Sequence, residues 1–354
     1  MKPGVTRRAL LSLVPNTLAA GATAVHKPRR APAAHGEFVR FVDPTTEAWV
    51  LRLTALSSAS VLPAPQNRFI SSKHHFLIFS SDRTGAMTPF HLDLHTGALR
   101  PLAETKGLAA RSLCLDRRER SVYFVDGGLL KEAALAGRKT RTIAEDVTAF
   151  GMSCSGSALL IARRGRLFRW NDSHPIAEDA AFGPLVRPDG TGCLFGREAR
   201  GGREFWYVPL APLAKPRLLV SGRIWNPFWS PRGKNLLFLR DVETKTAVLS
   251  EIHEANPETG VERKLDPTSE FAAFAPNGNA SVFVGASRSK AQPTIILLLR
   301  SVARELTLCE HDATHPASVS PVFSPDSRRV FFQSDREGKA ALYSIDVEKF
   351  VNPT

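Results

Sequence analysis

Sulfur-containing residues are scarce in this chain. Its 354 residues include four cysteines and three methionines. The cysteines show no CxxC spacing, so no zinc site built from close cysteine pairs is expected. Each cysteine lies in or beside an apolar, strand-like run, which predicts core thiols; a disulfide is compatible with export, but a chain of this size does not require one. The four positions are Cys114, Cys154, Cys193 and Cys309.

Motifs of common catalytic centres are also missing. The stretch Gly151–Gly156 has Ser155 where the GxSxG motif of serine hydrolases needs its second glycine. The chain has no room for a hydrolase domain after the repeats described below, and it contains no phosphate-binding glycine loop. The sequence therefore assigns no catalytic residues.

Positive charge is in excess. Lysine and arginine total 47 against 34 acidic residues, which gives a formal net charge of +13. Such an excess is typical of a protein with a solvated basic surface, or of a protein that binds an acidic partner such as a polyanionic sugar. No nucleic-acid motif and no basic stripe interleaved with aromatic residues is present, so a nucleic-acid partner is not expected.

The first 36 residues contain no acidic residue. Arg7 and Arg8 precede a short apolar stretch that ends in Ala22-Thr23-Ala24, the layout of an export signal with a small-x-small cleavage site. The arginine pair indicates the Tat route. We therefore predict a signal over residues 1–24, a linker over 25–36 and a periplasmic or secreted protein; a disordered basic tail is the alternative. The apolar stretch is too short for a membrane span.

One unit of sequence recurs along the rest of the chain. In its last copy, three apolar runs, Val322–Phe323, Val330–Phe332 and Leu342–Val347, are separated by turn-forming residues, which predicts three short strands. Six similar units precede this copy. Four of the units share a turn of the Pro-Asp-Gly class, and these turns recur at the roughly 40–50 residues that one β-propeller blade needs. The turns begin at Pro188, Pro231, Pro276 and Pro325.

The two ends of the repeat region indicate how a ring would close. The last unit supplies three strands, whereas Phe38–Thr54 reads as two outer strands around a turn at Asp43 and has no blade of its own. That turn resembles the outer hairpin turns that begin at Asp93 and Asn256. We predict one all-β domain over 37–354, a seven-bladed β-propeller whose N-terminal strand completes the C-terminal blade and leaves no open edge. A six-bladed ring with an extra sheet is the alternative, because the second and third units are weakly marked.

The Ser-Pro-Asp-Gly and Ser-Asp-x-x-Gly units resemble those of TolB-type and PD40-type periplasmic propellers. The whole mature chain also resembles the oligogalacturonate lyase family of pectin degradation, whose fold is a seven-bladed propeller. This resemblance implies the fold, but a shared fold does not fix a function. The stretches that carry it are Trp49–Thr54, His75–Asp82 with Asp93–Gly97, Leu308–His311 and Pro321–Tyr343.

The resemblance also implies a metal site. Members of that family hold a manganese-type ion with three histidines and a glutamine, and the ion neutralises the substrate carboxylate for β-elimination. On the implied register, two of the histidines fall at Ser318 and Ser320, the third at Asn226, and the glutamine at His315. Hydroxyls and an amide do not replace imidazoles for such an ion. We therefore expect no metal, and manganese or zinc only if the protein is a carbon–oxygen lyase with a rebuilt site.

Propeller ligands bind over the central channel, where the loops that enter the inner strands converge. Arg223 and Trp225 form the most binding-like pair, because an indole stacks on a sugar face and a guanidinium holds a carboxylate. The alternative is a core tryptophan beside a solvated arginine; His311 and His315 form either a different site or a surface loop. The residues predicted in these loops are His74, Arg111, Arg223, Trp225, Asn226, Glu270, His311 and His315.

Three functions are compatible with these observations. The first is a monomeric exported propeller that binds an acidic oligosaccharide or an envelope protein through Arg223, Trp225, Asn226, His311 and His315. The second is an oligogalacturonate-type lyase with altered ligands, against which the ligand positions argue. The third is a TolB-like envelope scaffold, against which the lack of TolB's additional N-terminal domain argues. Whether the protein is an enzyme stays open at this point.

Overall fold

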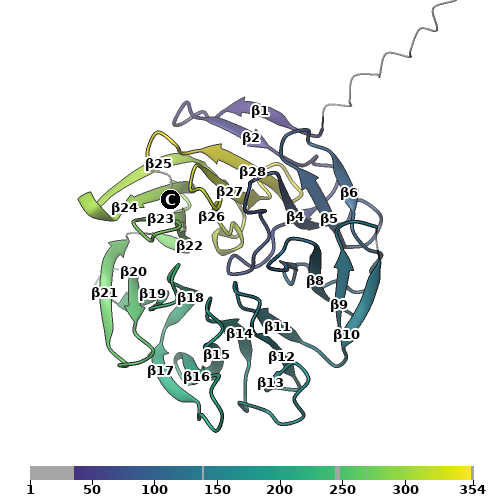
Figure 1. Ribbon diagram of the computed structural model, residues 1–354. Coiled ribbons are helices and arrows are strands. Elements are labelled where there is room, and N and C mark those ends of the chain that lie inside the picture. Colours follow the sequence, from purple (N-terminus) through teal and green to yellow (C-terminus); the bar gives the residue numbers. More distant parts are fainter. Residues whose placement is uncertain (1–35, 138, 244–247, 269, 352–354) are drawn as a thin grey trace, which may run out of the picture. The chain divides into compact units, whose positions relative to one another are not determined.

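The computed structural model describes residues 36–351, except 138, 244–247 and 269. Within these ranges the strands form seven sheets, which lie around a common axis as the blades of a ring (Figure 1). This confirms the predicted seven-bladed propeller and excludes the six-bladed alternative. The predicted export signal and nearly all of the predicted linker lie outside the described residues.

Each blade is an antiparallel meander that runs outward from the ring axis. In the first three blades the strands are, from the inside outward, β3 (Ser60–Val61), β4 (Phe76–Ser81), β5 (Thr88–Asp93) and β6 (Leu99–Pro101); β7 (Cys114–Leu115), β8 (Ser121–Asp126), β9 (Leu129–Ala134) and β10 (Thr140–Ala144); and β11 (Ala149–Met152), β12 (Leu159–Arg163) and β13 (Arg166–Arg169). In the third blade an isolated bridge between Leu167 and Ala177 takes the place of a fourth strand.

The next three blades have four strands each. Their strands are β14 (Phe182–Val186), β15 (Gly192–Ala199), β16 (Gly202–Pro209) and β17 (Arg217–Gly222); β18 (Ile224–Trp229), β19 (Leu236–Glu243), β20 (Val248–Ala255) and β21 (Glu262–Thr268); and β22 (Phe271–Pro276), β23 (Val282–Ser287), β24 (Thr294–Leu299) and β25 (Arg304–Glu310). The helical elements among the described residues are two short 3-10 turns, η1 (Arg300–Val302) and η2 (Pro316–Ser318).

The seventh blade joins the two ends of the described chain. Its order is β26 (Val322–Phe323), β27 (Arg329–Ser334), β28 (Ala341–Asp346), β2 (Trp49–Arg52) and β1 (Val39–Val42). The predicted closure is confirmed, because Val50 of β2 lies opposite Ile345 of β28. The N-terminal segment contributes two strands to this blade. The turn between them is held by Asp43, whose Oδ1 accepts hydrogen bonds from the backbone N–H groups of Thr45 and Thr46.

The same turn follows the inner strand of every blade. In each copy the N–H group of the fourth residue donates to the carbonyl of the first, as Gly190 does to Arg187 at 2.8 Å. The fourth residue always has a positive φ, from 54° at Glu119 to 79° at Gly190. We call the end of the ring that carries these turns the turn face, and the opposite end, where the chain enters the inner strands, the loop face. The first residues of the turns are Ser71, Asp116, Ser153, Arg187, Ser230, Asn277 and Ser324.

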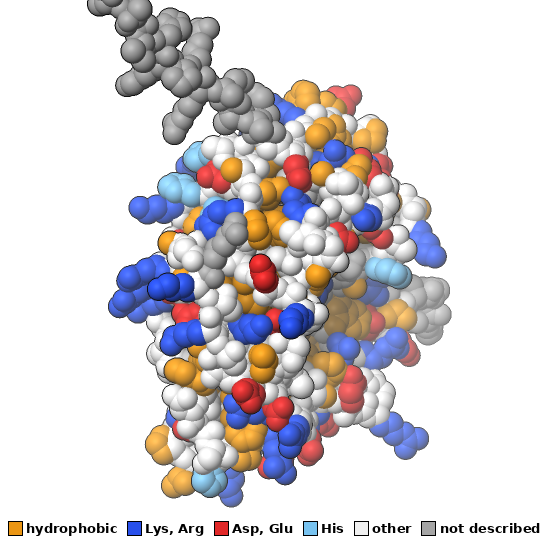
Figure 2. All heavy atoms as spheres, turned by 90° about the vertical axis from the view of Figure 1, so that its right-hand side faces the viewer, with side chains coloured by type: hydrophobic (Ala, Val, Ile, Leu, Met, Phe, Trp, Pro, Cys, Tyr) orange, Lys and Arg blue, Asp and Glu red, His pale blue; other side chains and the backbone are white. Residues whose placement is uncertain are grey.

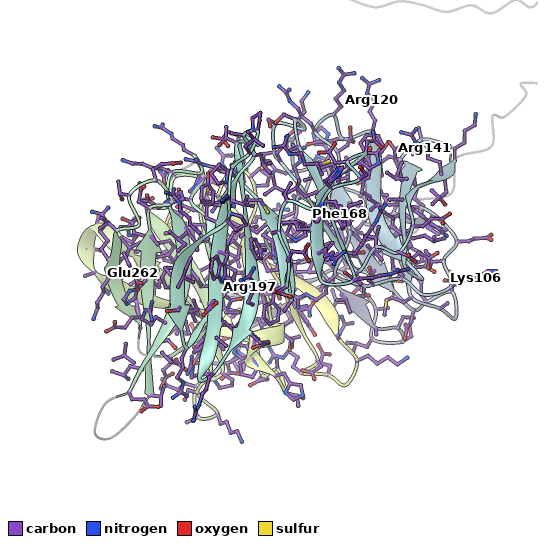
Figure 3. All side chains as sticks on the ribbon, turned by 90° about the horizontal axis from the view of Figure 1, so that it is seen from below. Lys106, Arg120, Arg141, Phe168, Arg197 and Glu262 are labelled. Carbon is purple, nitrogen blue, oxygen red and sulfur yellow. The ribbon has the colours of Figure 1, made fainter. Side chains whose placement is uncertain are left out.

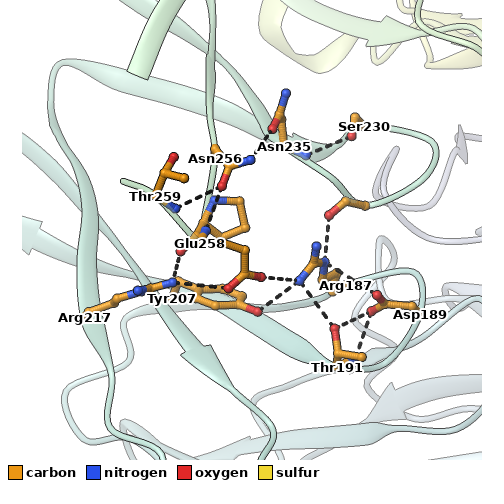
Figure 4. A network of polar contacts seen from close by, with 12 residues as sticks. Arg187, Asp189, Thr191, Tyr207, Arg217, Ser230, Asn235, Asn256, Glu258 and Thr259 are labelled. Carbon is orange, nitrogen blue, oxygen red and sulfur yellow. Dashed lines mark hydrogen bonds and ion pairs between the residues drawn. The ribbon is translucent and has the colours of Figure 1, made fainter. Parts of the chain in front are cut away.

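Side-chain oxygens close six of the seven turns. Ser71 is typical: its Oγ accepts hydrogen bonds from the N–H groups of His75 and Phe76 at 2.9 and 3.1 Å. Serine, aspartate and asparagine suit this position because their short polar side chains reach the nearby backbone. The exception is Arg187, whose guanidinium instead donates to the carbonyl of Gly233 at 2.7 Å and to Glu258 at 2.7 Å (Figure 4). This arginine therefore ties blade four to blade five.

The core consists of the faces that neighbouring blades press together. Phe228 of blade five meets Phe274 of blade six edge to face, with ring centroids 5.6 Å apart. Close packing of this kind between blades fixes their spacing around the ring. Packing within a blade is equally tight: Gly285 of β23 lies beneath the ring of Phe271 of β22, where a Cβ would come within 2.5 Å of the ring atoms, so the position has room only for glycine.

The four cysteines are free thiols. Cys114, Cys193 and Cys309 are buried, as predicted, and burial raises the pKa of the Cys114 thiol to about 11. The prediction was wrong for Cys154, which is exposed. It directly follows Ser153, the first residue of the blade-three turn, and therefore lies in the turn and outside the strand.

Charged groups of both signs are scattered over the side of the molecule drawn in Figure 2. On the side drawn in Figure 2, Lys and Arg side chains alternate with Asp and Glu over much of the surface and form no continuous basic stripe. In the part of the chain that the structure describes, no helix is both long and apolar enough to cross a membrane.

Candidate functional site

A hollow of about 800 Å³ opens on the loop face between blades four, five and six. Its walls come from the β15–β16 turn, the start of β18, the end of β19 and the segment that follows β23. Ala317 of η2 closes one side. Segments that are far apart in the sequence thus meet because their blades are neighbours in the ring.

Trp225 lies in the wall of this hollow, on β18. One part of the indole packs against the main hydrophobic core, so the side chain is only partly buried. The guanidinium carbon of Arg288 lies 5.4 Å from the centroid of the ring. Both interpretations of the sequence therefore apply to this residue: it fills part of the core and also presents aromatic surface to the hollow.

Three arginines line the hollow with Trp225. Arg223 forms an ion pair with Glu243, and both side chains are largely exposed, at 47% and 70%. Exposed pairs contribute at most about 1 kcal/mol, so this guanidinium is readily available to another carboxylate. Arg203 stacks over Phe182, 4.6 Å from the ring centroid, and has no acidic partner within hydrogen-bonding range among the described residues.

Arg288 is held more firmly than the other two arginines. Its Nη2 donates to the carbonyl of Phe271 at 2.9 Å and contacts the hydroxyl of Ser250, and its guanidinium lies 3.5 Å from the nearly buried carboxylate of Asp241. These partners fix Arg288 beneath Trp225. The hollow thus combines the anchored guanidinium of Arg288 with the exposed one of Arg223 and the half-buried one of Arg203.

Asn226 also lines the hollow, in a left-handed conformation with φ of 49°. Its side-chain amide donates to the carbonyl of Ala272 at 3.1 Å, which links blade five to blade six. A left-handed conformation at a non-glycine residue is concentrated at functional positions. Outside the turn face, Ser320 shares this feature on the loop that enters β26, with φ of 50°.

The positions at which the resemblance implies metal ligands do not form a metal-binding donor set. The hydroxyl of Ser318 donates to the carbonyl of His315 at 2.7 Å, and Ser320 Oγ accepts a hydrogen bond from Arg111 at 2.8 Å. A guanidinium at Ser320 repels a cation, and hydroxyls with one amide are poor ligands for manganese or zinc. Among the residues that the structure describes, no group of three His, Cys, Asp or Glu side chains is arranged around a common point.

The two histidines of this loop have different environments. His311 is completely buried; its Nδ1 accepts the N–H of Ala313 at 3.0 Å, so its Nε2 carries the proton and donates to the carbonyl of Ser287 at 3.0 Å. Burial lowers the pKa of His311, and the imidazole is neutral. His315 is exposed at the start of η2. His311 is therefore committed to holding the loop, and His315 remains accessible.

The sequence prediction and the structure differ over which residues meet. Arg223, Trp225 and Asn226 do lie together in the hollow. His74 was placed in the loops over the channel, but it occupies the blade-one turn on the turn face, 3.4 Å from Asp326. Arg203 and Arg288 were missed. Arg288 follows the second strand of its blade as Arg83 and Arg336 do in theirs, and this repeated position was the available signal.

Comparison with solved structures finds the same architecture in oligogalacturonate lyase from Vibrio parahaemolyticus. The TM-score is 0.78 at 21% sequence identity, over 88% of this chain and 96% of that chain. This chain has the fold of oligogalacturonate lyase. A structure of oligogalacturonate lyase in complex with manganese gives the same values. A chain of the mitotic checkpoint complex is less similar, with a TM-score of 0.56 at 14% identity over 92% of this chain and 99% of that chain.

No family model matches the sequence, and no curated protein matches it. Identity of 21% establishes the shared fold and leaves the function to the site itself. TolB from Acinetobacter baumannii has a TM-score of 0.45, which supports no argument for a TolB-like role. The predicted scaffold function therefore stays a prediction.

Proposed function

We propose that this propeller binds an acidic saccharide in the hollow on its loop face. The observation that carries the proposal is the presence of Trp225 among the guanidinium groups of Arg203, Arg223 and Arg288. Aromatic rings offer an apolar face to the C–H side of a sugar ring, and guanidinium groups bind carboxylates through two parallel hydrogen bonds.

The ion pair between Arg223 and Glu243 supplies a mechanism for accepting an acidic ligand. A ligand carboxylate takes the place of Glu243 on the guanidinium. Since both side chains are exposed, the displaced carboxylate of Glu243 returns to water at little cost. Arg203 adds a half-buried guanidinium without an acidic partner among the described residues, whereas Arg288 remains paired with Asp241 and supports the indole.

A β-eliminating lyase is the second candidate, and the fold shared with oligogalacturonate lyase favours it. That candidate needs a metal site. The donors at Asn226, His315, Ser318 and Ser320 fit neither manganese nor zinc, and Arg111 places positive charge beside them. We therefore propose binding without a metal, and binding of a saccharide in preference to a protein partner.

The expected setting follows from the N-terminal sequence. Arg7 and Arg8 before an apolar stretch support export by the Tat route. The proposal is of a monomeric periplasmic or secreted protein that meets acidic oligosaccharides outside the cytoplasm.

Titration with galacturonate oligomers tests the proposal, with neutral galactose oligomers as the comparison ligands. Arg223→Gln should weaken binding by roughly 1–3 kcal/mol, the usual loss of a charge-assisted contact. Trp225→Ala should also weaken binding, because it removes the apolar surface for the sugar ring. Thermal unfolding must accompany Trp225→Ala, because part of the indole packs in the core. Trp170→Ala removes a tryptophan that is 41% exposed on the third blade and should leave binding unchanged.

A chelator should have no effect on this binding. Stoichiometric manganese in the purified protein, together with release of unsaturated uronides that stops on chelation, would overturn the proposal in favour of the lyase. Equal affinity for acidic and neutral oligomers would show that the arginines do not bind the carboxylates of the ligand.

A further inference from the structure

A further arginine lies on the loop face outside the hollow. Arg111 belongs to the loop that enters β7, and its Nη2 donates to the hydroxyl of Ser320, on the loop that enters β26, at 2.8 Å. That hydroxyl is neutral, and no carboxylate pairs with Arg111 among the residues that the structure describes. Its charge is thus uncompensated, unlike that of Arg223 or Arg288.

The backbone around Arg111 is fixed by hydrogen bonds. Its carbonyl accepts the N–H of Ala64 at 2.9 Å, and the carbonyl of Ala110 accepts the hydroxyl of Ser80 at 2.7 Å. The loop of Ser320 is fixed as well, because the side-chain amide of Gln333 donates to the carbonyl of Ser318 at 2.7 Å. The guanidinium is therefore presented from a rigid support, which reduces the entropy lost when a ligand binds.

Solvent reaches Arg111, yet protein surrounds the guanidinium closely enough for burial to lower its pKa. A guanidinium without an acidic partner gains from an added carboxylate. The left-handed backbone of Ser320, at a residue only 2% exposed, is a strained feature that the core must stabilise. Both observations indicate a position built for a ligand.

Arg111 and the hollow are connected by one loop. Ala317 lines the hollow, and Ser320, three residues later, contacts Arg111. Three residues span at most about 10 Å. A ligand bound against Trp225 needs to extend only a short way along this loop to reach Arg111.

We propose that Arg111 is a second anion-binding position, which holds the carboxylate of another unit of the same acidic oligosaccharide. This inference rests on the proposed function and narrows its ligand to chains with at least two acidic sugars. A single uronate engages the hollow alone, whereas an oligomer engages the hollow and Arg111.

The experiment compares galacturonate with trigalacturonate by calorimetric titration of the full chain. Arg111→Gln should weaken trigalacturonate binding about tenfold, the equivalent of about 1.4 kcal/mol, and leave galacturonate binding unchanged. The matched control is Arg120→Gln, which removes an exposed arginine from the turn face of the same blade; its side chain points away from the ring (Figure 3). This control should bind both ligands as the wild type does.

Two further variants separate ligand binding from support of the loop. Ser320→Ala removes the hydrogen bond to Arg111 but keeps the charge, so it should retain most of the affinity for trigalacturonate. Arg111→Lys keeps the charge without the planar fork and should fall between the wild type and Arg111→Gln. A loss in Ser320→Ala as large as that in Arg111→Gln would mean that Arg111 only supports the loop, and would overturn the inference.

The outcomes also distinguish this inference from the proposed function. If Arg223→Gln weakens trigalacturonate binding and Arg111→Gln does not, the second position is wrong and the hollow remains the binding site. If Arg111→Gln weakens both ligands equally, it acts through the hollow and the second position is again wrong. If no variant changes binding of either ligand, both proposals fail.

Discussion

The turn face and the loop face of this ring differ in how regular their backbone is. The turn face repeats one backbone conformation in all seven blades, with the same hydrogen bond and the same positive φ. The loop face is less regular: a left-handed residue four positions before the turn occurs in three of the blades, at Gly183, Asn226 and Ser320, and the arginines of this face come from different strands. Regularity on one face satisfies the backbone locally, whereas irregularity on the other brings unlike side chains together.

The left-handed position of these turns accepts several residue types. Glycine occupies the left-handed position in three blades, but His74, Glu119, Ala280 and Ser327 adopt it as well. This conformation costs a non-glycine residue roughly 1–2 kcal/mol. The turn tolerates that cost because hydrogen bonds accepted by its first residue hold it closed.

Opening the ring should have the largest effect, because both faces depend on closure. Deleting residues 36–54 removes β1 and β2, leaves β28 as an edge strand and uncovers the buried residues Tyr343 and Ile345. We expect an aggregating protein without a cooperative unfolding transition, measured by light scattering and calorimetry. The control lacks only residues 1–35. A monomeric deletion variant that unfolds cooperatively would show that closure is dispensable.

Removing a turn-closing hydroxyl should have an intermediate effect, confined to stability. Ser71→Ala leaves the N–H groups of His75 and Phe76 without their acceptor, at a site that is 1% exposed. We expect a loss of about 1–3 kcal/mol in the free energy of unfolding and no change in saccharide affinity. The exposed neighbour Ser72 provides the control, since Ser72→Ala should change neither. Lower affinity in Ser71→Ala would show that the two faces are coupled.

Acid should have the smallest effect within the physiological range. Burial lowers the pKa of His311 on the loop face, and burial followed by Arg100 lowers that of His91 on β5 from 6.5 to about 4. The unfolded chain therefore takes up protons more readily than the folded one, and the free energy of unfolding should fall as the pH drops from about 6.5 towards 4.

Denaturant unfolding at several pH values measures this dependence. His311→Gln and His91→Gln should each flatten this dependence, and the larger change identifies the histidine that contributes more to it. Carboxylates with a lowered pKa, such as Asp93, act mainly below this window. A wild-type stability that stays constant between pH values of about 6.5 and 4 would contradict the assignment of neutral buried histidines.

The fold could be predicted from the sequence because turn-forming residues recur at similar intervals in its repeat. Blades four, five and seven show the Pro-x-Gly or Pro-Asp-Ser pattern in register with the turn, whereas in blade six Pro276-Asn277-Gly278 lies two residues before it and Ala280 takes the left-handed position. Blades one and two carry the same turn with His74 and Glu119 at the left-handed position, and a pattern search for glycine does not find them. This is also why His74 was predicted on the wrong face.

The site was less predictable, since it depends on neighbours around the ring. Arg223, Trp225 and Asn226 follow one another in the sequence and were found together. Arg203 and Arg288 lie on other blades, and only the ring brings them to Trp225. The burial of His311 was equally hidden, because its partner is the carbonyl of Ser287 at the end of β23, 24 residues earlier and not on an adjacent strand of the blade.

Closure by β2 also fixes the order in which the chain can reach its native state. Val50 is synthesised about 300 residues before Ile345, its partner in the sheet, so this contact has the highest sequence separation and forms late. A nascent chain has every blade but the seventh before closure is possible, and it then carries a β1–β2 hairpin without a sheet to join. The ring is thus completed only once β28 is available, and premature termination before β28 leaves an edge open to aggregation.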